Sequence, residues 1–185
     1  IAFRTISHVS NIMVRVESDT GAFGLGAGSP EKFVTGETLE ACEAALKEQD
    51  WGVLIGKKIA DWPAQRKHFF SKAPAANAAI EIALYDLWAQ GQNLPLAAAL
   101  GKVVHQKLPT SITIGIKPWA ETAVEAQEYL ARKFQVIKLK LGGGNVEEDI
   151  ERTIKLRELV GQNIAIRVDM NQAFTPADYA HFLKS

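Results

Sequence analysis

The chain has 185 residues, of which 47% are hydrophobic, and its 21 basic side chains balance 21 acidic ones. This length is enough for one good core or two small ones. The zero net charge gives no reason to expect nucleic acid or an anionic membrane as a partner. We find no signal-peptide pattern and no apolar run long enough to span a bilayer. The single cysteine excludes a disulfide framework within the chain, so we expect a cytoplasmic protein.

The first hundred residues predict a β-hairpin followed by helices. Within residues 11–17, Ile12, Val14 and Val16 alternate with Met13, Arg15 and Glu17. Turn residues follow at 18–21, so residues 22–27 are expected to return as the partner strand. After a loop, Thr38 is the expected N-cap of a helix that ends near Glu48. Three further helices are expected: one from residue 61 or 62, one from Pro74 to about Gly91, and one over residues 94–100.

Two polar residues in this part are expected to be structural. Cys42 lies on an apolar helical stripe with Leu39 and Leu46, which is typical of a small core residue. Asp86 lies inside the Ala-rich helix and is expected to make a structural polar contact. The four histidines are scattered without the spacing of metal ligands.

The pattern changes at Leu108-Pro109. Strands are expected over residues 110–116, 136–141 and 164–170, and helices over residues 119–133, 147–160 and 176–184. Strands joined through helices run parallel. We therefore expect an α+β domain over residues 1–108 and the start of a parallel βα system over residues 109–185.

Two lysines on the second of these strands are the most informative feature. Side chains alternate along a strand, so Lys138 and Lys140 share one face while Ile137, Leu139 and Leu141 share the other. Lysine is rarely buried without a partner. The lysine face is therefore either a solvated edge or a catalytic interior, as it would be inside a closed barrel.

The next strand adds a carboxylate to the same kind of face. Asp169 lies at its carboxyl end, on the polar face with Arg167 and Asn171. Neighbouring lysines lower each other's pKa and can then act as bases near neutral pH. A carboxylate at a strand end can hold a divalent metal, which stabilises an enolate. This combination suits proton abstraction beside a substrate carboxylate.

Two glycine-rich stretches suggest other chemistry. Gly24, Gly26 and Gly28 do not fit a dinucleotide-binding loop, because the third glycine falls one position early and Pro30 follows where a helix should begin. Glycines of a hairpin explain them better. Residues 142–144 could hold a phosphate at a helix start, but a flexible βα loop is the favoured interpretation.

Several segments resemble the muconate lactonizing subgroup of the enolase superfamily. Residues 137–142 (IKLKLG) resemble its K-x-K strand, and residues 167–172 (RVDMNQ) resemble its first metal-ligand strand. Residues 79–87 resemble the last long helix of its capping domain. Residues 26–30 and 33–38 resemble its active-site lid, and the residues of this lid are most similar to those of the dipeptide epimerases. The resemblance covers essentially the whole chain.

The resemblance implies a fold and a set of roles. Residues 1–108 would be an α+β N-terminal capping domain, and residues 109–185 would be the first three βα units of a TIM-type (β/α)₇β barrel. Lys140 would be the base on one face of the substrate, with Lys138 beside it, and Asp169 the first of three Mg²⁺ ligands. Asn171 and Arg167 would lie just outside the metal ligands. The lid would be formed by Gly28, Phe33, Val34, Thr35, Gly36 and Glu37.

The function that this resemblance implies is Mg²⁺-dependent epimerisation of a small carboxylate substrate, first of all a dipeptide such as Ala-Glu. A muconate-type cycloisomerase, an o-succinylbenzoate synthase or an N-acylamino acid racemase would share the same residues. A non-catalytic fragment or pseudoenzyme that acts as a binding module, and a phosphate-binding doubly wound domain, are alternatives of other classes.

In similar proteins the remaining metal ligands and the opposite-face lysine lie on later strands. The 185-residue chain is thus expected to be an N-terminal fragment that is inactive alone. The full-length protein is expected to be a homo-oligomer.

Overall fold

The computed structural model describes residues 8–65 and 73–185. It divides into two compact units, one within residues 8–106 and the other over residues 107–185. Each unit has its own buried clusters of hydrophobic residues. No helix in the described part of the chain is long and apolar enough to cross a membrane.

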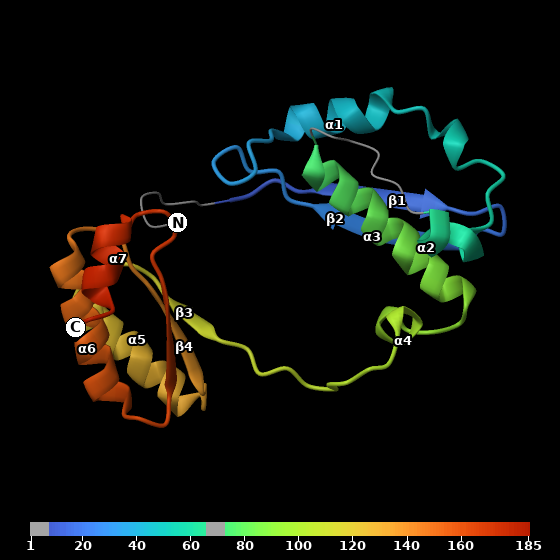
Figure 1. Cartoon of the computed structure of the whole chain (residues 1–185). Coiled ribbons are helices and arrows are strands. Elements are labelled where there is room, and N and C mark those ends of the chain that lie inside the picture. The colour runs from blue at the N-terminus through green and yellow to red at the C-terminus, as the bar shows by residue number, and fades with distance from the viewer. Residues whose placement is uncertain (1–7, 66–72) are drawn as a thin grey trace. The chain divides into compact units, whose positions relative to one another are not determined.

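The N-terminal unit consists of a hairpin and a long helix that packs against it (Figure 1). Strand β1 (Ile12–Glu17) pairs antiparallel with β2 (Phe23–Gly28), as predicted. Helix α3 (Pro74–Gly91) begins with proline in its first turn, where the missing N–H costs no hydrogen bond. The other elements are α1 (Leu39–Glu48), η1 (Trp51–Val53), η2 (Ile59–Asp61), α2 (Trp62–Gln65) and α4 (Leu96–Leu100). Thr38 caps α1, as predicted.

The glycines of β2 let this strand approach α3 closely. A Cβ at Gly26 would overlap the carbonyl oxygen of Ala79, far inside the 3.0 Å that real Cβ atoms keep. Gly24 and Gly28 meet α3 carbonyl oxygens in the same way one turn on and one turn back. The interpretation of these glycines as hairpin residues is confirmed. Their spacing matches the four-residue repeat of the facing helix, which explains it physically.

Asp86 ties the same helix to the same strand. Its Oδ2 accepts a hydrogen bond from the Leu25 N–H at 2.9 Å. The predicted structural role of Asp86 is therefore confirmed.

Cys42 is a fully buried core residue, as predicted. Burial, followed by a hydrogen bond to Glu37, raises the pKa of its thiol to about 11. Because the thiolate is the reactive form, we expect native protein to react with a disulfide reagent far more slowly than urea-unfolded chain. The reaction is followed by the rate at which the reagent releases its own thiol. Equal rates with native and unfolded chain would contradict the prediction.

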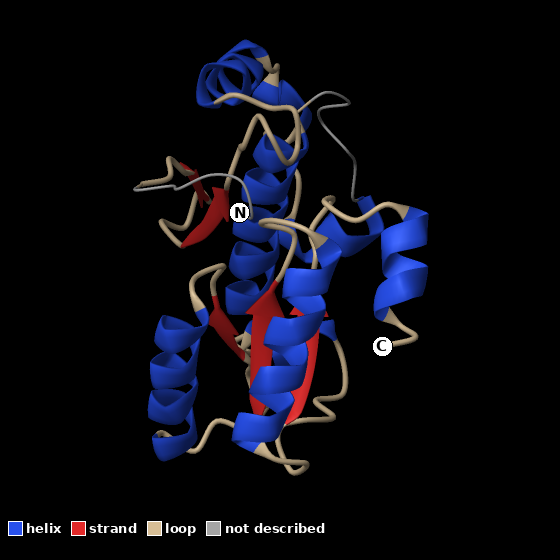
Figure 2. Ribbon diagram, turned by 90° about the vertical axis from the view of Figure 1, so that its left-hand side faces the viewer, coloured by secondary structure: helices blue, strands red, loops and turns tan. Residues whose placement is uncertain are grey.

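The C-terminal unit contains three parallel strands, as predicted, which Figure 2 draws in red. Their order in the sheet is β3-β4-β5. The strands are β3 (Ile112–Ile114), β4 (Val136–Lys140) and β5 (Ala165–Asp169), and the helices are α5 (Trp119–Ala131), α6 (Val146–Val160) and α7 (Pro176–Phe182). β3 is shorter than the predicted 110–116. Asn145 caps α6, and Thr175 with Asp178 forms a capping box on α7.

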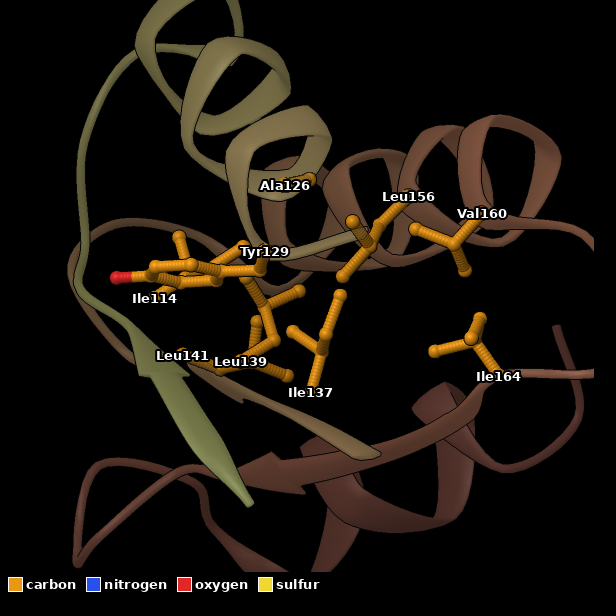
Figure 3. Packing of buried hydrophobic residues seen from close by; sticks show 9 residues of the cluster. All are labelled: Ile114, Ala126, Tyr129, Ile137, Leu139, Leu141, Leu156, Val160 and Ile164. Atoms are coloured by element: carbon orange, nitrogen blue, oxygen red, sulfur yellow. The ribbon is translucent and has the colours of Figure 1, made fainter. Parts of the chain in front are cut away.

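The hydrophobic face of this sheet is closed by helices. Ile137, Leu139 and Leu141 are completely buried, as their alternation predicted. Figure 3 shows Ile137 pointing toward Leu156 of α6, and Ile164 pointing toward Val160 of the same helix. Since alternate residues face opposite ways, this packing places the lysines of β4 on the other face of the sheet.

Candidate active site

The strand register aligns the polar residues of β4 and β5. Lys138 lies across from Arg167, and Lys140 lies across from Asp169. Lys140 and Asp169 are the last residues of their strands. In parallel sheets, ligands bind outside the carboxyl ends of the strands, so a ligand site is expected at this edge of the sheet.

Both lysines bind the same carboxylate oxygen. Lys138 Nζ lies 2.7 Å and Lys140 Nζ lies 2.8 Å from Oδ2 of Asp169. The side chains of Lys140 and Asp169 are 22% and 23% exposed. Hydrogen bonds from Lys138 and Lys140 hold the pKa of the Asp169 carboxyl far below its ordinary value. The site therefore pairs one firmly ionised carboxylate with two amines in a partly buried setting.

Asn171 completes this cluster. Its backbone has a φ of 52°, in the left-handed region that asparagine tolerates better than most residues. Its N–H donates to Asp169 Oδ1 at 2.9 Å, and its side-chain Oδ1 accepts from Lys140 Nζ at 3.0 Å. The structure thus brings together Lys138, Lys140, Asp169 and Asn171, while Arg167 is exposed on the same face.

Asp169 fits the role of a metal ligand, but the described residues provide only part of a site. Carboxylate oxygen is the ligand that Mg²⁺ prefers, and this carboxylate is ionised and partly exposed. Among residues 8–65 and 73–185, no group of three or more His, Cys, Asp or Glu side chains could hold a metal ion.

The predicted lid residues lie in the N-terminal unit. Gly28 ends β2, and Val34 and Thr35 form a turn in which both N–H groups donate to the Glu31 carbonyl oxygen. Phe33 and Val34 are 64% and 72% exposed. An apolar pair this exposed is available to contact a ligand or another surface.

Glu37 differs from the rest of that segment because it is only 5% exposed. Its Oε1 accepts from the Ala75 N–H at 2.8 Å and from the Cys42 Sγ at 3.2 Å. It thus satisfies an N–H in the first turn of α3, where a negative charge is favourable. Glu37 anchors the end of the predicted lid segment to the unit's core.

Sequence reasoning missed a buried ion pair beside the lysine strand. Asp149 and Arg152 of α6 have side chains only 4% and 12% exposed, and their closest charged atoms are 3.4 Å apart. Asp149 Oδ2 accepts the Gly142 N–H at 2.6 Å, so this amide of the 142–144 loop is already bonded within the protein. The available signal was the three-residue spacing of opposite charges on the apolar side of a helix, next to Ile150.

Two family comparisons cover most of the chain. Residues 1–101 match the N-terminal domain of the mandelate racemase / muconate lactonizing enzyme family, and residues 121–185 match an enolase C-terminal domain-like family. The first match spans more than half of the 185 residues. The chain belongs to the mandelate racemase/muconate lactonizing enzyme family. The predicted relation to the enolase superfamily is thereby confirmed.

Curated members of this family include dipeptide epimerases. The chain is 49% identical, over all of its length and 52% of the relative, to the L-Lys-D/L-Arg epimerase of Desulforapulum autotrophicum. It is 34% identical, over 96% of its length and 49% of the relative, to the L-Ala-D/L-Glu epimerase of Bacillus subtilis. The chain spans about half the length of these relatives.

Solved structures in this family agree with the fold. The dipeptide epimerase of Methylococcus capsulatus, in a crystal structure with Mg and the dipeptide L-Arg-D-Lys, has a TM-score of 0.88 at 45% identity. The comparison covers all of this chain and 52% of that one. A substrate-liganded L-Ala-D/L-Glu epimerase from Bacillus subtilis has a TM-score of 0.89 at 33% identity, covering 99% of this chain and 52% of that one.

Proposed function

We propose that the protein is a Mg²⁺-dependent dipeptide epimerase. This chain would supply the capping domain and the first three βα units of a (β/α)₇β barrel that further strands close. The observation that carries the proposal is the convergence of Lys138 and Lys140 on Asp169 at the carboxyl ends of two parallel strands. The family membership and the dipeptide epimerases among the relatives support it.

Lys140 is the proposed base. Its Nζ, as the free amine, would take the α-proton from one face of the substrate, and a lysine from a later strand would return a proton on the other face. Lys138 would bind the substrate carboxylate as a cation. Asp169 would hold Mg²⁺, which when bound stabilises negative charge on the substrate carboxylate. Asn171 would keep Asp169 and Lys140 in place through its two hydrogen bonds.

The relatives favour a basic dipeptide over Ala-Glu as substrate. The L-Lys-D/L-Arg epimerases of two organisms are 49% and 48% identical to this chain, and the L-Ala-D/L-Glu epimerase of Bacillus subtilis is 34% identical. We therefore propose dipeptides of lysine and arginine as the first substrates to test, in place of Ala-Glu. The segment from Gly28 to Glu37 is proposed to close over them through its exposed Phe33 and Val34.

The test is deuterium exchange by the full-length protein. With Mg²⁺ in D₂O and a pooled dipeptide library, we expect deuterium at the α-carbon of Lys- and Arg-containing dipeptides, read by mass spectrometry. The exchange should disappear with a chelator and return with Mg²⁺. The 185-residue chain is the negative control, because its described residues offer no complete metal site.

Other outcomes of this test are equally informative. Exchange confined to Ala-Glu would overturn the basic substrate but keep the epimerase. Exchange into N-acyl amino acids alone would replace it by a racemase of the kind represented by the 34% identical N-succinyl-L-Arg/Lys racemase of Bacillus cereus. No exchange into either class would overturn the proposal. The homo-oligomer stays a prediction.

A further inference from the structure

One guanidinium bridges the carboxyl ends of two neighbouring strands. Arg152, in α6, donates from Nη2 to the Gly115 carbonyl oxygen at 3.2 Å. It donates from Nη1 to the Lys140 carbonyl oxygen at 3.3 Å. Gly115 follows β3 directly and Lys140 ends β4. The planar fork of arginine suits such a double contact, which a lysine ammonium cannot reproduce.

Asp149 extends this contact to the residues that follow Lys140. It lies one helical turn before Arg152, and its Oδ2 accepts the Gly142 N–H at 2.6 Å. Leu141 N–H, between them, donates to the Asp169 carbonyl oxygen at 3.0 Å. Three backbone groups of this segment, the Lys140 carbonyl, the Leu141 N–H and the Gly142 N–H, are thus held in place.

The pair is buried at a cost. Two charges taken out of water lose solvation that their mutual attraction only partly restores, so a buried ion pair is weak evidence for stability. Hydrophobic residues at positions 149 and 152 would avoid this cost, but they would leave the carbonyls of Gly115 and Lys140 and the Gly142 N–H without these partners. The pair therefore contributes the placement of these backbone groups more than net stability.

We propose that Arg152 and Asp149 are positioning residues that fix the backbone of Lys140 and thereby the place of its amine. This inference rests on the proposed function, in which Lys140 is the base. The lysine side chain is long, so a small rotation at its backbone moves Nζ by a larger distance. A displacement of about 1 Å at a reacting group can cost on the order of a hundred-fold in rate.

Arg157 provides a matched control on the same helix. Its Nη1 donates to the carbonyl oxygens of Gly161 and Ile164 at 2.6 and 2.7 Å. It is therefore also an arginine that holds two backbone carbonyls, but from one nitrogen and in the last turn of α6. Arg152→Lys and Arg157→Lys each keep the positive charge, while only Arg152 contacts the backbone of Lys140.

The experiment compares α-proton exchange of the two epimers of one dipeptide by full-length protein with Mg²⁺ in D₂O. The epimer whose exchange is lost in Lys140→Ala is the one that Lys140 deprotonates. Arg152→Lys is expected to slow exchange without inversion of this epimer by roughly ten- to a hundred-fold at saturating substrate. Its KM, and exchange without inversion of the other epimer, should change little. In Arg157→Lys, the ratio of the exchange rates of the two epimers should equal that of the wild type.

A purely structural role gives a different result. The proposal would be overturned if Arg152→Lys slowed α-proton exchange of both epimers equally. It would also be overturned if the ratio of the two exchange rates were the same in Arg152→Lys and Arg157→Lys. If Arg152→Lys does not fold, Asp149→Asn takes its place and the same ratio is measured.

A second readout separates this inference from the proposed function. If the wild type exchanges no dipeptide, the proposed function fails, and the position of Lys140 is followed by NMR of protein labelled with ¹³C at lysine Cε. The Lys140 signal, assigned from its absence in Lys140→Ala, should shift in Arg152→Lys and not in Arg157→Lys. An unmoved signal in Arg152→Lys would overturn the inference.

Discussion

Replacing Lys140 by alanine in the full-length protein is expected to lower dipeptide epimerisation by roughly 10²–10⁴-fold, the usual contribution of a positioned base. The reason is geometric, because no other described amine takes its place. Lys138 binds the same Asp169 oxygen, but it lies two residues back from the carboxyl end of β4. The measurement is kcat with each epimer in turn, together with deuterium exchange.

The fold should survive this change. Asp169 keeps its hydrogen bonds from Lys138 and from the Asn171 N–H, so its charge stays compensated. Lys155→Ala is the matched control, since this lysine of α6 is 41% exposed and pairs with Glu151. The control should keep wild-type activity. Wild-type epimerisation by Lys140→Ala would remove Lys140 from the mechanism.

Replacing Gly26 by alanine is expected to destabilise the N-terminal unit by about 3 kcal/mol or more, at the upper end of overpacking effects. The added methyl group would overlap the Ala79 carbonyl oxygen and crowd the Ala83 N–H, both in the backbone of α3. Backbone cannot turn aside as a side chain does, so β2 and α3 must separate. Their separation would weaken the packing of the hairpin against α3.

Urea unfolding followed by tryptophan fluorescence measures this effect, because Trp51, Trp62 and Trp88 all lie in the N-terminal unit. Gly91→Ala, in the facing helix α3, is the control, because its new Cβ would lie 3.6 Å from Ile59 Cγ2, an ordinary contact. Alanine also has a higher helix propensity than glycine. If Gly26→Ala and Gly91→Ala unfolded at the same urea concentration, the packing argument would be contradicted.

The local elements and the two faces of each strand could be predicted from the residues alone. Alternation over residues 136–141 predicted which side of β4 is buried, and Ile137, Leu139 and Leu141 are indeed inside. The parallel direction of the three strands followed from the intervening helices. These features were predictable because strand alternation and helix periodicity are properties of the local backbone.

The contacts between groups far apart in the chain became known only from the folded structure. The register of β4 against β5 brings Lys138 and Lys140 to one oxygen of Asp169, and the approach of α3 explains why β2 carries glycine at alternate positions. The charged pair Asp149 and Arg152 could pass for a solvated pair in the sequence, yet it is buried. The strand register, the close approach of two backbones and the burial of a charged pair depend on packing between segments far apart in the chain, so a local pattern is not enough to predict them.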